Sequence, residues 1–166
     1  MTYFEGMEGF LMENKVLLLL NDDLKLTGMH YALDNFAAFQ VDWNEVRWPT
    51  AEHAYQAAKF MNNPETKDLI DMIRQARSPH DAQKLANKAI RHIRQDWDLV
   101  KFGVLKEIII AKCSQNQYVM QTLLLTRFDT IVDPLVYTLV PDMEERSQLI
   151  KILGQIRHET ISGYSF

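Results

Sequence analysis

The stretch from Arg47 to Phe60 contains the residue types best suited to chemistry in this chain. Glu52, Gln56 and Lys59 are spaced by four and three residues, so a helix would place their side chains on one face. Four alanines surround them and would let other parts of the chain pack closely. A carboxylate, an amide and an amine on one face could stabilise a cation and hold a polar ligand.

The start of this helix is marked by Pro49 and Thr50, because a threonine hydroxyl can accept from the free N–H groups of a first turn. Glu52 in that turn suits the positive end of the helix dipole, an effect worth about 0.3–1 kcal/mol. The pattern alone favours a solvated surface stripe, since most charged stripes face water. The other interpretation is a site carboxylate with Trp48 and Tyr55 as aromatic neighbours.

Composition restricts the class of protein. The chain has 166 residues, 47% of them hydrophobic and 24% charged, which predicts one globular domain. A net charge of −4 without a basic tail argues against a protein held on nucleic acid by phosphate contacts. The single cysteine, Cys113, allows no internal disulfide and fits a reducing compartment. The apolar run Val16–Leu20 is too short to span a bilayer, so we expect a cytoplasmic protein without membrane association.

Several common catalytic and cofactor motifs are absent. The six glycines are scattered and form no phosphate-binding loop, and the histidines show no metal-ligand spacing. We therefore expect no cofactor and no metal. The side chains that remain as candidates for catalysis are carboxylates, amides, a lysine and aromatic rings. That set suits bond cleavage at a sugar C1, where a carboxylate stabilises an oxocarbenium-like centre and rings stack on a base.

Periodicity predicts an α+β fold, mostly helical, with a small β-sheet or hairpin. Residues 1–14 are expected to fray, and residues 15–160 to form one domain. A hairpin is expected to turn at Asn44-Glu45. Strands are expected at 15–20, 39–43, 46–48, 129–132 and 135–140, with a loop at 21–34. Helices are expected to start at 50 and 63 and to cover 80–93, 97–113, 117–126 and 144–158.

Two features of the later helices concern possible contacts. Lys84, Lys88, Arg91 and Arg94 give the helix at 80–93 a basic face, which favours a solvated surface first and a phosphate-contacting edge second. Asp96 is placed to cap the helix that follows.

The chain also carries longer motifs that follow a specific order. The runs are Asn35-Phe36-Ala37, Trp48-Pro49-Thr50-Ala51-Glu52-His53, Tyr55-Gln56-Ala57-Ala58-Lys59-Phe60, Ser78-Pro79, Asp96-Trp97-Asp98-Leu99-Val100-Lys101 and Leu149 to Arg157. Together they resemble the NADAR (YbiA-like) family, whose N-terminal signature reads S-N-F and then W-P-T-x-E-H-x-(F/Y)-Q-(A/S)-x-K-F. The later segments resemble R-x-D-W-x-x-V-K and L-G-x-x-L-M-x-x-R. The resemblance covers roughly residues 34–157, most of one domain.

This resemblance implies an α+β domain with N-glycosidase activity. The implied substrates are nucleotide-like small molecules, either ribosylamino-pyrimidine phosphates of riboflavin synthesis or ADP-ribosylated guanine, including that base in nucleic acid. Glu52 would be the main catalytic carboxylate, Trp97 would stack on the base or sugar, and Lys59 would contact phosphate or capture the opened sugar as an imine. The implied substrate-binding residues are Asn35, Phe36, Trp48, Tyr55, Gln56 and Lys101.

One part of the family pattern is missing. The family carries an acidic residue, then (F/Y)-W-G and a glycine-rich loop before the last helix, whereas residues 133–144 contain no glycine and no tryptophan. Glycines allow close backbone approach to a ligand, so this loop cannot act in the same way. Two classes therefore stay open: an active N-glycosidase with an altered pocket, and an inactive NADAR-like module that binds a nucleotide, an ADP-ribosyl group or a protein partner.

Overall fold

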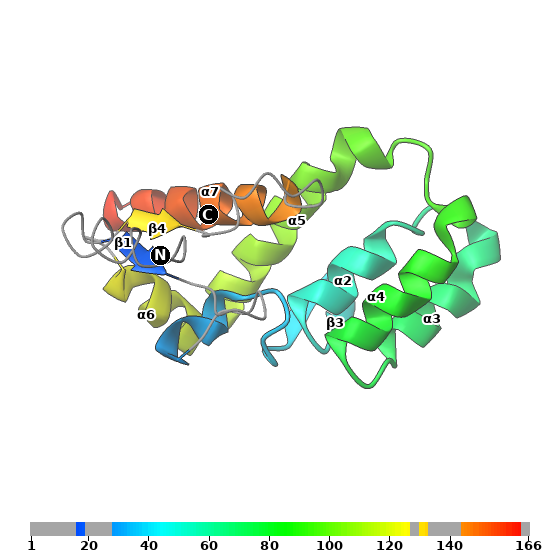
Figure 1. Cartoon of the computed structure of the whole chain (residues 1–166), viewed down its shortest axis with the longest axis horizontal. Coiled ribbons are helices and arrows are strands. Elements are labelled where there is room, and N and C mark those ends of the chain that lie inside the picture. Colours follow the sequence, from blue (N-terminus) through cyan, green and yellow to red (C-terminus); the bar gives the residue numbers. More distant parts are fainter. Residues whose placement is uncertain (1–15, 19–27, 127–129, 133–143, 164–166) are drawn as a thin grey trace, which may run out of the picture. The chain divides into compact units, whose positions relative to one another are not determined.

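The computed structural model describes residues 16–18, 28–126, 130–132 and 144–163 of the chain. These residues form a mostly helical fold with a small antiparallel hairpin, which confirms the predicted fold class (Figure 1). The chain contacts define two compact units, residues 35–117 and residues 1–34 with 118–166. Every predicted site residue lies in the first of these units.

The first unit is built around one short helix, α2 (Ala51–Ala58). This helix packs against three other helices and the hairpin (Figure 1). The elements of the unit are β2 (Val41–Trp43), β3 (Val46–Trp48), α2, the 3-10 helix η2 (Pro64–Thr66), α3 (Lys67–Arg74), α4 (Pro79–Lys88), the 3-10 helix η3 (Ile90–His92) and α5 (Trp97–Gln115). Because α2 lies among these elements, its polar side chains are enclosed by protein.

The β2–β3 hairpin has the predicted turn, with Asn44 and Glu45 at φ 54° and 62°. Both values lie in the left-handed region, as a two-residue turn of type I′ requires. Gln115 near the end of α5 fixes the hairpin edge, since its amide accepts from Asp42 N and donates to Asp42 O, both at 2.7 Å. The hairpin therefore leads into α2 from a fixed position.

The predicted cap of α2 is confirmed, and α4 begins with the same kind of cap at Ser78. The Thr50 hydroxyl accepts from the His53 N–H at 3.3 Å, and the Ser78 hydroxyl accepts from the Asp81 N–H at 3.1 Å. The surface-stripe interpretation of α2 is wrong, because Glu52 and Gln56 are each only 4% exposed. The surrounding alanines admit neighbouring helices closely enough to bury the polar face.

The segment after α4 differs from the prediction. The helix expected over 80–93 ends at Lys88, and the short η3 follows. Here the chain turns back toward α2, where the Arg94 N–H donates to the Lys59 carbonyl at 2.8 Å. Asp96 does stand at the N-cap position of α5, but it makes no side-chain capping bond. Its carboxylate pairs with the Arg94 guanidinium instead.

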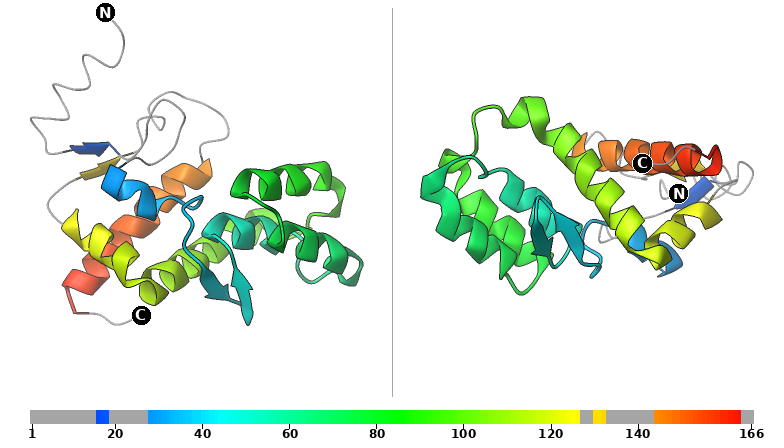
Figure 2. Two further views of the ribbon diagram at one scale, coloured as in Figure 1. Left: turned by 90° about the horizontal axis from the view of Figure 1, so that it is seen from below. Right: turned by 180° about the vertical axis from the view of Figure 1, so that it is seen from behind.

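The second unit contains a parallel pair of strands, β1 (Val16–Leu18) with β4 (Thr130–Val132), which Figure 2 shows from two further sides. Its other elements are the 3-10 helix η1 (Gly28–Leu33), α6 (Gln117–Leu125) and α7 (Glu144–Ile161). The predicted loop at 21–34 was therefore wrong at its end, where η1 forms. The Arg157 guanidinium on α7 donates to the Thr126 hydroxyl at 2.9 Å.

Some predictions fall outside the described residues, namely the frayed segment 1–14, the strand at 135–140 and the altered loop at 133–143. Among the helices that the structure describes, none has the length and apolar character needed to cross a membrane.

Candidate active site

The centre of the candidate site is the Glu52 carboxylate on α2. Gln56, one helical turn further on, donates its Nε2–H to Glu52 Oε1 at 2.6 Å. The Glu52 N–H donates to the Asn35 carbonyl at 3.0 Å, so the segment before the hairpin is joined to the first turn of α2. A buried carboxylate is costly unless it is hydrogen-bonded, and the amide of Gln56 supplies such a bond. The helix N-terminus adds favourable electrostatics for the anion.

Two buried oxygens near this carboxylate remain available as acceptors. Among the described residues, no hydrogen-bond donor reaches Asn35 Oδ1 or Gln56 Oε1. The orientation of the Gln56 amide follows from its bond to Glu52, because a carboxylate accepts and the NH₂ group must face it. A buried acceptor without a donor costs about 1–3 kcal/mol. Such oxygens are typical of a site that a ligand with N–H groups completes.

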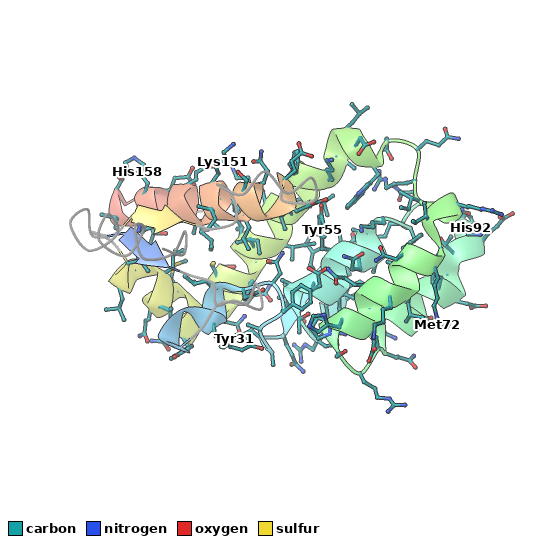
Figure 3. All side chains as sticks on the ribbon, in the orientation of Figure 1. Tyr31, Tyr55, Met72, His92, Lys151 and His158 are labelled. Carbon is teal, nitrogen blue, oxygen red and sulfur yellow. The ribbon has the colours of Figure 1, made fainter. Side chains whose placement is uncertain are left out.

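An aromatic pair lies next to the same helix. The Tyr55 and Trp97 ring centroids are 5.2 Å apart with an interplanar angle of 55°, and Figure 3 shows Tyr55 between α2 and α5. Lys59 Nζ lies 5.9 Å from the Tyr55 ring centroid, within cation–π range. Glu52, Tyr55 and Lys59 thus follow one another along α2, and Trp97 joins them from the first turn of α5.

The position of Trp97 is set by a short connection to α2. Arg94 donates from its backbone N–H to the Lys59 carbonyl at 2.8 Å, and its own carbonyl accepts from the Trp97 N–H at 3.1 Å. The Arg94 guanidinium also holds Asp96 through two bonds, Nε to Oδ1 at 2.6 Å and Nη2 to Oδ2 at 2.8 Å. This pairing lowers the pKa of Asp96 through the Arg94 hydrogen bonds. The segment is therefore fixed at both ends.

The sequence alone does not assign Arg94 or Asp96 to the Glu52 site. An arginine and an aspartate two residues apart, directly before Trp97, were the available signal. That spacing is also compatible with an exposed pair, so it did not predict the bidentate geometry.

His53, which directly follows Glu52, has a structural role. Its Nε2 lies 3.2 Å from the Ala76 carbonyl and must carry the proton there, because a carbonyl only accepts. Its Nδ1 then accepts from the Thr50 hydroxyl at 2.8 Å. Burial lowers the pKa of His53, and the hydrogen bond to Ala76 opposes this effect. A neutral imidazole in this place ties α2 to the segment after α3.

Three other predicted site residues have contacts outside the Glu52 cluster. Trp48 is fully buried and donates its indole N–H to the Trp43 carbonyl at 3.1 Å, within the hairpin. The Phe36 ring lies 4.8 Å from the His80 ring. Lys101 Nζ lies 3.4 Å from Asp98 Oδ1 on its own helix and 5.0 Å from the Phe102 ring centroid. The geometry thus unites Glu52, Gln56, Tyr55, Lys59 and Trp97, with Asn35 joined through its backbone.

No group of three or more His, Cys, Asp or Glu residues with the arrangement of a metal site occurs in the described part of the chain. The arrangement itself can stabilise positive charge at Glu52 and place a planar ring near Trp97.

Comparison with known proteins identifies the family of this chain. The model of the NADAR domain matches residues 25–135, well over half of the chain. The chain belongs to the NADAR family. It resembles an NMR structure of the Escherichia coli protein YbiA with a TM-score of 0.67 and 22% identity, covering 90% of this chain and 92% of that one. This likeness concerns the fold.

The curated relatives include two proteins named as N-glycosidases and one named as a riboflavin biosynthesis protein. The chain is 31% identical over 99 residues to N-glycosidase Npun_R5314 of Nostoc punctiforme, which is 60% of this chain and 63% of that protein. It is 32% identical over 92 residues to N-glycosidase YbiA of Escherichia coli, 55% of each chain. It is 30% identical over 124 residues to the chloroplastic riboflavin biosynthesis protein PYRR of Zea mays, 69% of this chain and 20% of that one. The chain thus spans less than two thirds of each relative.

Proposed function

We propose that this NADAR protein hydrolyses the N-glycosidic bond between a ribosyl group and a base. The observation that carries the proposal is the buried Glu52 carboxylate, hydrogen-bonded by Gln56 and followed on the same helix by Tyr55, whose ring contacts Trp97. A fixed anion beside aromatic rings suits a reaction in which positive charge develops on a sugar that carries a flat base. The relatives named as N-glycosidases support the same reaction class.

In the proposed reaction, the bond between C1 and the base nitrogen breaks and its electron pair leaves with the nitrogen. Glu52 stabilises the positive charge that develops at C1 and orients the attacking water. The water oxygen bonds to C1, and one water proton is delivered through Glu52 to the leaving base. The helix N-terminus favours the anionic form of Glu52, which suits a stabiliser or a base better than an initial acid.

Trp97 and Lys59 have supporting roles in this scheme. Trp97 would stack on the base or the sugar, since its ring is already held against Tyr55. Lys59 would contact a phosphate group of the substrate. A bolder role is capture of the opened sugar aldehyde as an imine, which requires a neutral amine and therefore a lowered pKa.

The substrate would be a ribosylated base with N–H groups, either a ribosylamino-pyrimidine phosphate or ADP-ribosylated guanine. The acceptors Asn35 Oδ1 and Gln56 Oε1 support this class, because amino groups on such bases can satisfy them. Phe36 and Lys101 stay predicted substrate-binding residues, whereas the fully buried Trp48 bonds within the hairpin and would support the site from behind. A relative named for riboflavin biosynthesis favours the pyrimidine.

The test is release of free base from both substrates by wild type and by Glu52→Gln. The substitution keeps the side-chain volume but removes the charge, so we expect kcat to fall by about 10²–10³-fold, as for loss of one preorganised electrostatic group. The matched control is Glu65→Gln, an exposed acid on η2, which should retain wild-type kcat. Equal turnover by Glu52→Gln and wild type would refute the assigned role. Tight binding of either substrate without base release by wild type would instead identify a binding module.

A further inference from the structure

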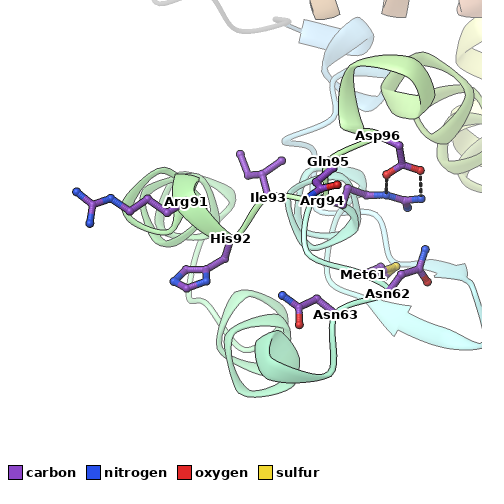
Figure 4. A pocket seen from close by; sticks show the side chains of 9 residues that line it. All are labelled: Met61, Asn62, Asn63, Arg91, His92, Ile93, Arg94, Gln95 and Asp96. Atoms are coloured by element: carbon purple, nitrogen blue, oxygen red, sulfur yellow. Dashed lines mark hydrogen bonds and ion pairs between the residues drawn. The ribbon is translucent and has the colours of Figure 1, made fainter.

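A groove with a volume of about 570 Å³ lies beside the connection that leads to Trp97. Its walls come from the segment after α2, residues 61–63, and from residues 91–96 (Figure 4). The volume is within the range of small-ligand sites and exceeds what a single ion requires. No step of the proposed hydrolysis uses these residues.

The polar groups of this groove include several hydrogen-bond donors. Asn63 accepts from the Glu65 N–H through Oδ1 at 3.0 Å, so the position of its NH₂ group is set by that bond. Figure 4 shows that Asn63 comes from one of the two lining segments and His92 from the other. Asn62 and Gln95 add two further amides, and Arg91 stands at the rim. A ligand rich in oxygen acceptors fits such a set.

Arg94 is a cation of the groove whose side chain is held in one orientation. The Asp96 carboxylate accepts from Arg94 Nε and Nη2, which fixes the orientation of the guanidinium. The third nitrogen, Nη1, takes no part in these two bonds. The Arg94 side chain is 20% exposed and thus still reachable from solvent. Asp96 is the one acidic residue among those that line the groove, and Arg94 engages both its carboxylate oxygens. Because Asp96 occupies the two-bond face of this arginine, a phosphate oxygen would bind Arg94 through Nη1 in a single charge-assisted hydrogen bond.

The groove also has an apolar part. Met61 and Ile93 contribute to its walls, and both side chains are partly exposed. A flat base could lie on this surface while its phosphate reaches the donors. Lys59 lies seven positions after Glu52, about 10 Å further along the helix, and the lining of the groove begins two residues beyond it.

We propose that this groove binds the phosphate of a nucleotide at a place separate from Glu52. The nucleotide would be either a free molecule or the distal end of an extended substrate; the second source rests on the proposed function. Binding involves no bond cleavage, so its measurement is independent of catalysis.

The test is calorimetric titration with adenosine monophosphate and with inorganic phosphate, using wild type, Arg94→Gln and His92→Ala. Loss of a charge-assisted bond should weaken nucleotide binding by about tenfold or more. Arg47→Gln is a matched control, because Arg47 forms the same two-bond pair with Asp42 in the hairpin, at 2.7 and 2.8 Å. Lys88→Ala, an exposed cation of α4 outside the groove, controls for net charge. Both controls should bind within about twofold of wild type, since exposed charges contribute little.

Three outcomes would overturn the proposal: no binding of nucleotide or phosphate by wild type at millimolar concentration, equal losses in the two controls, or loss of nucleotide binding in Glu52→Gln. His92 is exposed, so His92→Ala keeps the test valid if circular dichroism shows that Arg94→Gln does not fold. A raised KM for an ADP-ribosyl substrate in His92→Ala would identify the substrate as the source of the phosphate. An unchanged KM with weakened nucleotide binding would identify a separate nucleotide. Absence of base release would refute the proposed function and leave the titrations unaffected.

Discussion

Replacing Thr50 by alanine should destabilise the protein more than the loss of a simple helix cap. The Thr50 hydroxyl accepts from the His53 N–H at 3.3 Å and donates to His53 Nδ1 at 2.8 Å. Loss of the cap costs about 1 kcal/mol. His53 is 1% exposed, so its Nδ1 would lose its donor away from water, which costs about 1–3 kcal/mol more. We expect the free energy of unfolding to fall by about 2–4 kcal/mol.

Urea denaturation at neutral pH measures this difference. Ser78→Ala is the matched control, because Ser78 caps α4 through one bond to the Asp81 N–H and should cost only about 1 kcal/mol. Thr50→Ser keeps a hydroxyl and should stay within about 1 kcal/mol of wild type. If Thr50→Ala loses no more than Ser78→Ala, the second hydrogen bond does not stabilise the fold and the assignment of the His53 tautomer is wrong.

Three further results are expected. Burial lowers the pKa of His53, so on acidification the unfolded chain takes up this proton at a higher pH than the folded chain does. The contribution of His53 to the free energy of unfolding is therefore fully present above about pH 6.5 and declines as the pH falls. A urea midpoint unchanged between about pH 8 and 5.5 would contradict this. Burial raises the pKa of Cys113 to about 11, so a thiol reagent at about pH 8 should label the native protein far more slowly than the urea-unfolded chain, and rapid native labelling would refute it. Trp97→Phe should retain more base release than Trp97→Ala, because it keeps a ring against Tyr55; equal kcat/KM values for the two variants would exclude stacking.

The features that local chemistry controls could be predicted from the sequence. Asn44 and Glu45 adopt the turn that alternation on either side required, and Thr50 and Ser78 cap the helices that follow them. These features depend on a few neighbouring residues. The close spacing of Glu52 and Gln56 likewise follows from helical geometry.

Features that depend on tertiary contacts could not be predicted in the same way. A polar helix face has the same sequence pattern whether it meets water or protein, so the burial of Glu52 required knowledge of the packing around α2. Asp96 was expected to cap α5, but a nearby guanidinium competes for the same carboxylate with two charged bonds. The helix at 80–93 ends early, at a point where the chain turns to bring Arg94 to Lys59.

The complete burial of α2 has a consequence for the dynamics of this unit. All eight residues of the helix are buried, although a helix of this length is unstable on its own in water. It cannot open without also exposing the faces of α3, α4 and α5 that cover it. Hydrogen exchange of its amides should therefore require unfolding of the whole unit, and the carboxylate at its first turn should keep its geometry until that cooperative event.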